Sequence, residues 1–304
     1  MKKLYHFVPM LILSLFAVIF VILAEACIFT HHTLLDSEIY MQAMNEKNIT
    51  QSMYDELCTY FESLSHATGI PTEVFTDPLD KEELYTTSFK LLQESITYLK
   101  DKNAPKPSVN YDYSKVEKSI TDYIEKHAEE HNIEKNKEYQ KLINNTVKTA
   151  KTQIESRFDV MMLYTLSKTS GAEKLHNNSW LIGVGIFLFI GLTVLMLIIM
   201  VIIDRHHPRD FPYWAGLIMA VSAGFWLIPS AILKSQDFFA TFAIRNEYIY
   251  DSVTGMFDLA LSSIIRLQVI LLVIGILLII SAQLIHTIYL HYLKVKRRKR
   301  NSND

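Results

Sequence analysis

Two histidines in a short charged stretch have the spacing of a metal site. In the stretch HAEEH, His127 and His131 lie four residues apart, and Glu130 precedes the second histidine. Residues four apart on a helix face the same way, so the two imidazoles could share a zinc ion while the carboxylate acts as a general base. Such a site needs a third protein ligand, which the sequence does not locate.

A structural interpretation competes with this metal site. One helical stripe is formed by Val116, Ile120, Tyr123 and Ile124, and the two histidines continue its edge. Short strings of this kind also arise by chance in segments rich in lysine and glutamate. We therefore favour the structural interpretation, expect no metal or other cofactor, and keep His127 and His131 as weak metal candidates.

Three charges at the ends of apolar runs form a second candidate site. Glu25 lies near the end of the first run, Lys234 follows the third run, and Arg266 precedes the fourth. Charges at membrane depth are costly and are usually paired or functional. We predict that the three lie at one depth and that Glu25 approaches Lys234 or Arg266. The alternative is that each side chain reaches water separately.

Four apolar runs must position these charges, and they predict four membrane spans. The run 180–203 has 24 uncharged residues. As a helix it reaches roughly 36 Å, which exceeds a hydrocarbon core of about 30 Å. The other predicted spans are 7–28, 211–233 and 267–290. Within the third, Gly216, Ala220 and Gly224 recur every four residues and predict a face where another helix packs closely.

Basic residues predict the orientation of these spans. Lysine and arginine occur before the first run, in the connection 204–210, and in the tail KVKRRKR after the last run. All three places fall on one side, which the positive-inside rule makes cytoplasmic. We expect a multi-pass plasma-membrane protein with 1–6, 204–210 and 291–304 in the cytoplasm and 29–179 and 234–266 outside. The tail is expected to bind anionic lipid, and its place beside a span argues against nucleic acid.

The first run also has features of a signal peptide. It ends in LAEAC, and Ala24-Glu25-Ala26 fits the small-x-small cleavage pattern. However, its apolar part is longer than usual for a signal. Cys27 is a poor lipidation site because Ala24 and Glu25 stand where leucine and a small residue are usual. We favour a retained span, with cleavage and lipidation as the alternatives.

The outside segment reads as a domain of helices. Half of the chain is hydrophobic, yet residues 29–179 carry 24 acidic and 17 basic side chains. Apolar residues recur at helical spacing, and no alternating strand pattern occurs. The first stripe comprises Met53, Leu57, Phe61 and Leu64, and the second comprises Tyr85, Phe89, Leu92, Ile96 and Leu99. The third stripe lies on a predicted helix of about 35 residues and comprises Tyr139, Ile143, Val147, Ala150, Ile154, Phe158 and Met161. We expect an all-α fold in which an antiparallel helical bundle stands between spans 1 and 2, with an amphipathic helix in 234–266.

These features favour a binding role over an enzymatic one. We expect a membrane-anchored sensory or adaptor protein whose acidic outer domain binds a protein, an envelope component or a small ligand, as a homo-oligomer or with a protein partner. The alternative is a subunit of a channel or transporter with an extracellular helical cap, which would need polar groups along the spans. A zinc hydrolase built on His127, Glu130 and His131 is a distant third.

Overall fold

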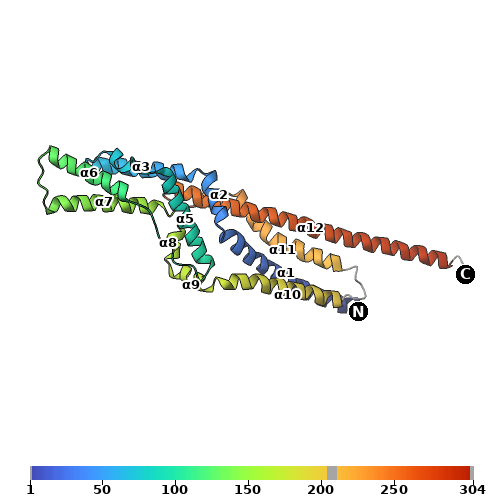
Figure 1. The fold of residues 1–304 in the computed structure, drawn as a ribbon. Helices are drawn as coiled ribbons and strands as arrows, with labels where there is room; N and C mark the ends of the chain where they lie inside the picture. The colour runs from blue at the N-terminus through green and yellow to red at the C-terminus, as the bar shows by residue number, and fades with distance from the viewer. Residues whose placement is uncertain (1, 204–210, 302–304) are drawn as a thin grey trace. The chain divides into compact units, whose positions relative to one another are not determined.

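The computed structural model describes residues 2–203 and 211–301, and every regular element in these ranges is a helix. Figure 1 shows the helices in chain order. The all-α class predicted from the apolar spacing is thereby confirmed for the described part of the chain. The connection 204–210, which we expected in the cytoplasm, lies outside the described residues, as do the last three residues of the basic tail.

Four helices are long and apolar enough to cross a membrane. They are α1 (Lys2–Phe29), α10 (Trp180–Ile203), α11 (Phe211–Ser235) and α12 (Glu247–Asn301). Each contains one of the four predicted apolar runs. Large apolar side chains project from their surfaces, and Phe187 on α10 is 80% exposed within the chain. Helices that are apolar all round are typical of segments that lie in lipid.

The chain divides into two compact units. The first, which we call the span unit, comprises Met1–Leu34, Leu181–Thr241 and Asp258–Asp304. The second, which we call the helical unit, comprises Leu35–Trp180 and Phe242–Phe257. Helix α12 is therefore divided: its first residues belong to the helical unit and the rest to the span unit.

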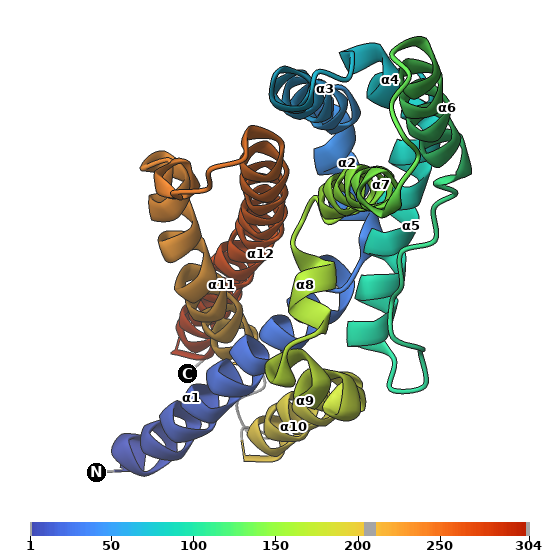
Figure 2. The same ribbon diagram turned by 90° about the vertical axis from the view of Figure 1, so that its left-hand side faces the viewer.

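In the span unit, α1, α10 and α11 share one apolar core. Its fully or nearly buried members are Met10, Ala17, Val18, Met200, Trp214 and Ile218. The rings of Phe20 on α1 and Phe189 on α10 stack, with their centroids 6.5 Å apart. Figure 2 shows α11 beside α12. At its end, α1 continues as a π-helical turn, η1 (Thr30–Leu34), and a 3-10 turn, η2 (Phe238–Thr241), follows α11.

The helical unit contains eight complete helices and the first turns of α12. They are α2 (Ser37–Glu46), α3 (Ile49–Thr68), α4 (Thr72–Thr76), α5 (Lys81–Lys100), α6 (Ser114–Glu130), α7 (Lys137–Arg157), α8 (Leu163–Ser167) and α9 (Ser170–Asn178). Helices α2, α5 and α7 begin where the side chains of Asp36, Asp80 and Asn136 accept backbone N–H groups. Helix α3 ends at Gly69, whose φ of 75° is the left-handed conformation that glycine adopts without strain.

The buried faces match the predicted stripes in α3 and α6 but not throughout α5. Met53, Leu57 and Phe61 on α3 are buried. On α5, Tyr85 and Phe89 are only half-buried, whereas Ser88 and Ser95 are completely buried. The two serine hydroxyls donate to the carbonyl oxygens of the preceding turn. Because these hydroxyls are satisfied within the helix, small polar residues can occupy its core face.

The predicted helix of about 35 residues at the end of this segment is wrong. Three helices replace it: α7 has 21 residues, and α8 and α9 follow. The carboxylate of Asp159 accepts the backbone N–H groups of Tyr164 and Thr165, at 2.9 and 2.8 Å, and so caps the start of α8. Phe158 and Met161, which we placed on the helical stripe, are buried in the connection instead.

Candidate functional site

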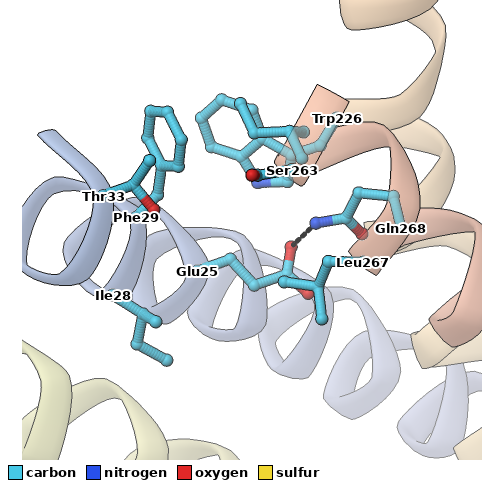
Figure 3. A pocket seen from close by; sticks show the side chains of 9 residues that line it. Glu25, Ile28, Phe29, Thr33, Trp226, Ser263, Leu267 and Gln268 are labelled. Atoms are coloured by element: carbon cyan, nitrogen blue, oxygen red, sulfur yellow. Dashed lines mark hydrogen bonds between the residues drawn. The ribbon is translucent and has the colours of Figure 1, made fainter. Parts of the chain in front are cut away.

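A pocket with polar side chains in its wall lies among α1, α11 and α12 of the span unit. Its volume is about 160 Å³, which can hold several water molecules or a small organic group. Figure 3 shows Glu25, Phe29, Trp226 and Gln268 around this space. The other lining residues are Ile28, Thr33, Ser263, Ile264 and Leu267. A largely apolar wall with a few convergent polar groups is the usual form of a small-molecule site.

Helical spacing assembles this wall. Glu25, Phe29 and Thr33 follow each other at intervals of four, so they share one face of α1 and of the π-helical turn η1. Turns of π-helix occur frequently at functional sites. On α12, Ile264 and Gln268 are likewise four residues apart. Trp226 of α11 completes the pocket from a third helix.

The polar groups of the pocket are incompletely hydrogen-bonded. Gln268 is 2% exposed, and its Nε2 donates to Oε2 of Glu25 at 3.4 Å. The amide oxygen Oε1 of Gln268 is buried and has no partner. The indole Nε1 of Trp226 is likewise buried without an acceptor. Leaving a buried donor or acceptor unpaired costs about 1–3 kcal/mol, so a ligand group that reached these two atoms would be stabilised there.

The structure gives Glu25 and Lys234 different partners from those predicted. Lys234 pairs with Asp258 at 3.4 Å, and its Nζ also donates to the hydroxyl of Ser262. Within the described residues, no ion pair joins Glu25 to Lys234 or to Arg266, whose side chain is exposed. Asp258, which our prediction did not consider, competes for the lysine. The common depth of the three predicted charges stays a prediction.

The predicted small-residue face forms a close helix contact over part of its length. A Cβ atom added to Gly216 would lie 2.6 Å from the carbonyl oxygen of Gly275 on α12. One added to Gly275 would lie 2.9 Å from the backbone nitrogen of Ala220. The backbones of α11 and α12 therefore touch here, as in small-residue helix pairs. Gly224, the third predicted member, meets nothing within 4 Å.

The histidine pair lacks the geometry of a zinc site. His127 and His131 are exposed, and their rings stack with centroids 4.2 Å apart. Helix α6 ends at Glu130, and the Nδ1 of His131 is within 3.0 Å of the carbonyl oxygen of His127. In the part of the chain that the structure describes, no three histidine, cysteine, aspartate or glutamate side chains gather as metal ligands. We assign no metal chemistry to the pair, because zinc needs further ligands.

In the helical unit, Arg157 attaches the start of α12. Its Nη2 lies 3.2 Å from Oε1 of Glu56, and the two side chains are only 13% and 29% exposed. The guanidinium group also lies 5.9 Å from the ring centroid of Tyr248, which is completely buried. Because Tyr248 is the second residue of α12, the first turn of this helix is part of the core of the helical unit.

The two cysteines are both free. Cys27 rests against α10, since a Cβ atom added to Gly185 would lie 3.0 Å from its Sγ. Burial raises the pKa of the Cys58 thiol, which is the opposite of what activates a thiol as a nucleophile.

Sequence reasoning found Glu25 but missed its neighbours in the pocket. Gln268 is a polar residue in an apolar run, and Trp226 lies ten residues beyond Gly216 in the third run. A glutamine within a predicted span was a usable signal, because polar side chains in membrane segments usually have a partner. Nothing in the sequence shows that these residues face Glu25, since that depends on how three helices pack.

The fold and the pocket together define the class: an all-helical protein with four helices that could span a membrane and a polar pocket among three of them. Comparison with protein-family models, with curated proteins and with solved structures finds no match to this chain.

Proposed function

We propose that the chain is a multi-pass plasma-membrane protein with a sensory or adaptor role, whose helical unit binds a partner or ligand outside the cell. One observation carries this proposal. Helix α12 begins in the core of the helical unit and continues without a break through the fourth candidate span. A change of packing around Tyr248 would therefore act directly on a helix that could cross the membrane.

The proposed orientation rests on the distribution of basic residues. The N-terminus, the connection 204–210 and the tail after α12 carry the lysine and arginine clusters, so all three are placed in the cytoplasm. The acidic helical unit is then outside. In this proposal, a change in the helical unit reaches a protein partner through the spans. The proposed role is one of binding and transmission and needs no catalytic group.

The proposal also includes a first span that is retained after synthesis. Met10 and Ala17 of α1 are completely buried in the core that they share with Met200 and Trp214. Cleavage after Ala26 would remove these side chains and expose their partners on α10 and α11. The intact mass of the purified protein tests this point: a chain that begins at Cys27 would contradict it.

Two measurements test the proposed function. In a variant without native cysteines, Ser63→Cys on α3 should react with a membrane-impermeant maleimide in intact cells, whereas Ser302→Cys should react only after lysis. The reverse pattern would refute the orientation.

The second measurement is hydrogen exchange of the full chain in nanodiscs. Tyr248→Leu should raise exchange in residues 247–257 and also in residues 261–268, because one helix connects them. The control is Tyr85→Leu, which changes a half-buried tyrosine of the same unit on α5. If exchange rises in 247–257 alone, α12 does not transmit and the sensory proposal fails.

A channel or transporter subunit is the second candidate, and one observation favours it. Glu25 and Gln268 place a carboxylate and an amide side by side on two candidate spans, which is the kind of polar group that a transport path requires. Ion or solute flux into liposomes that contain the purified chain, abolished by Glu25→Gln, would support this candidate over the sensory one.

A further inference from the structure

We propose that the pocket around Glu25 binds an ammonium group that bears at least one N–H and is attached to an apolar body. This ligand site lies in the span unit and does not depend on the sensory role proposed for the helical unit. The inference rests on three properties of the pocket: its negative charge, its unpaired hydrogen-bonding atoms and its apolar wall.

The ionised carboxylate of Glu25 would hold the cation, and a bound cation in turn favours this charged form. The Glu25 carboxylate is half-buried and receives one long hydrogen bond, from Gln268. Among the ion pairs of the described residues, none involves Glu25, and Lys234 is bound to Asp258. A carboxylate that is partly removed from water is stabilised by a cation at hydrogen-bond distance. A positively charged ligand would supply it.

The unpaired atoms require a donor on this cation. The Oε1 of Gln268 is a buried acceptor without a partner. Figure 3 shows Nε2 of Gln268 turned toward Glu25 and Oε1 turned away from it. An ammonium with N–H groups could donate to the carboxylate of Glu25 and, once the amide of Gln268 turns over, to Oε1 as well. A quaternary ammonium has no N–H and could satisfy only the charge. The unpaired Nε1–H of Trp226 could bind an acceptor atom on the same ligand.

The wall selects the apolar part of the ligand. Phe29 and Trp226 contribute aromatic rings, and Ile264 and Leu267 contribute aliphatic side chains. Aromatic faces attract cations, and apolar walls favour a hydrocarbon chain or ring next to the ammonium group. The volume of about 160 Å³ limits the buried part to a small group.

This chemistry has two sources, a free lipophilic amine and the headgroup of phosphatidylethanolamine. Both carry a primary ammonium. In the amine it is attached directly to the apolar body, whereas in the lipid two methylenes, a phosphate and glycerol separate it from the acyl chains. In the lipid, a phosphate oxygen could serve as the acceptor for the Nε1–H of Trp226. The experiment therefore needs one arm for a soluble amine and one for lipid.

In the first arm, the detergent-purified full chain is titrated calorimetrically with phenethylammonium. Two analogues separate the requirements: 2-phenylethanol lacks the charge, and trimethylphenethylammonium lacks the N–H groups. We expect phenethylammonium to bind at least about tenfold more tightly than either analogue, the loss expected from removing one charge-assisted interaction. Equal binding of the three compounds would overturn the proposal.

Variants then locate the binding site. Glu25→Gln keeps the size of the side chain and removes its charge, and Gln268→Leu removes the acceptor. Each should weaken phenethylammonium binding by about tenfold. Gln283→Leu is the matched control, because Gln283 lies on the same helix, is exposed and does not line the pocket. Thermal unfolding without ligand shows that each variant is folded, and binding that is unchanged in both pocket variants refutes the site.

In the second arm, the chain is placed in phosphatidylcholine nanodiscs with or without phosphatidylethanolamine, and bound lipid is counted by native mass spectrometry. Retention of phosphatidylethanolamine by wild type but not by Glu25→Gln identifies the lipid as the source. Binding of phenethylammonium without such retention identifies a free amine. If wild type and Glu25→Gln behave alike in both arms, the pocket is not an ammonium site.

Discussion

The contact between α11 and α12 at Gly216 and Gly275 makes a sharp prediction about stability. The change is Gly216→Ala, which adds one methyl group. That methyl would lie 2.6 Å from the carbonyl oxygen of Gly275 and 2.9 Å from the Cβ of Leu278. Since the nearest atom belongs to the backbone, no side chain can rotate away, and the two helices must separate.

The magnitude follows from two opposing effects. Overpacking a tight contact costs about 1–3 kcal/mol. Replacing glycine by alanine inside a helix gains about 0.5–1 kcal/mol when the site has space. We therefore expect Gly216→Ala to destabilise the span unit by about 1–2 kcal/mol. The matched control is Gly224→Ala on the same helix, where nothing lies within 4 Å, and it should be neutral or stabilising.

The assay is thermal or denaturant unfolding of the full chain in one detergent. Because Gly216 and Gly275 share a single contact, Gly275→Ala should also destabilise, and the double variant should lose less than the sum of the single losses. Equal stability of Gly216→Ala and Gly224→Ala would refute the reasoning, since it would mean that the backbones do not touch.

The other predictions concern the helical unit. Arg157→Ala should lower the free energy of unfolding by about 2–3 kcal/mol, because it leaves the partly buried carboxylate of Glu56 unpaired. The control is Lys126→Ala, which breaks an exposed ion pair and should change the free energy of unfolding by less than about 0.5 kcal/mol. Equal losses in the two variants would contradict the role of Arg157. Burial raises the pKa of Tyr40 to about 12, so the stability that its neutral form contributes is complete below pH 10 and is lost as the pH rises to about 12. Urea unfolding at pH 9 and pH 12 should therefore show Tyr40→Phe gaining about 2 kcal/mol on wild type over this range. Parallel pH profiles would show that Tyr40 is not buried.

The sequence predicted elements that depend on local signals. The apolar runs of α1, α10, α11 and α12 could be recognised by their length, because crossing a bilayer requires about twenty apolar residues. The stripes of α3 and α6 were equally plain. The failure at the end of α7 has a local cause too, but a weaker one. Asp159 looks like any surface residue until its carboxylate is seen to cap the next helix.

The candidate site was only partly predictable. Glu25 could be recognised because a charge in an apolar run is costly. Its partner could not, because three later residues on two helices offered a polar group at a similar place, and sequence distance does not rank them. Gln268 lies 243 residues after Glu25. The choice between Lys234, Arg266 and Gln268 depends on the rotation of α12 about its axis, which the packing of whole helices determines.

The glycine contact and the pocket are two parts of one helix crossing. Along α11, Trp226 lies about 15 Å from Gly216, and along α12, Gln268 lies about 10 Å from Gly275. The backbones touch at the glycines, and Gly224, two residues before Trp226, already meets nothing within 4 Å. The close backbone contact therefore does not extend to Gly224, and the predicted small-residue face packs over only part of its length. Beyond this contact the pocket lies between Trp226 and Gln268, with Glu25 of α1 in its wall.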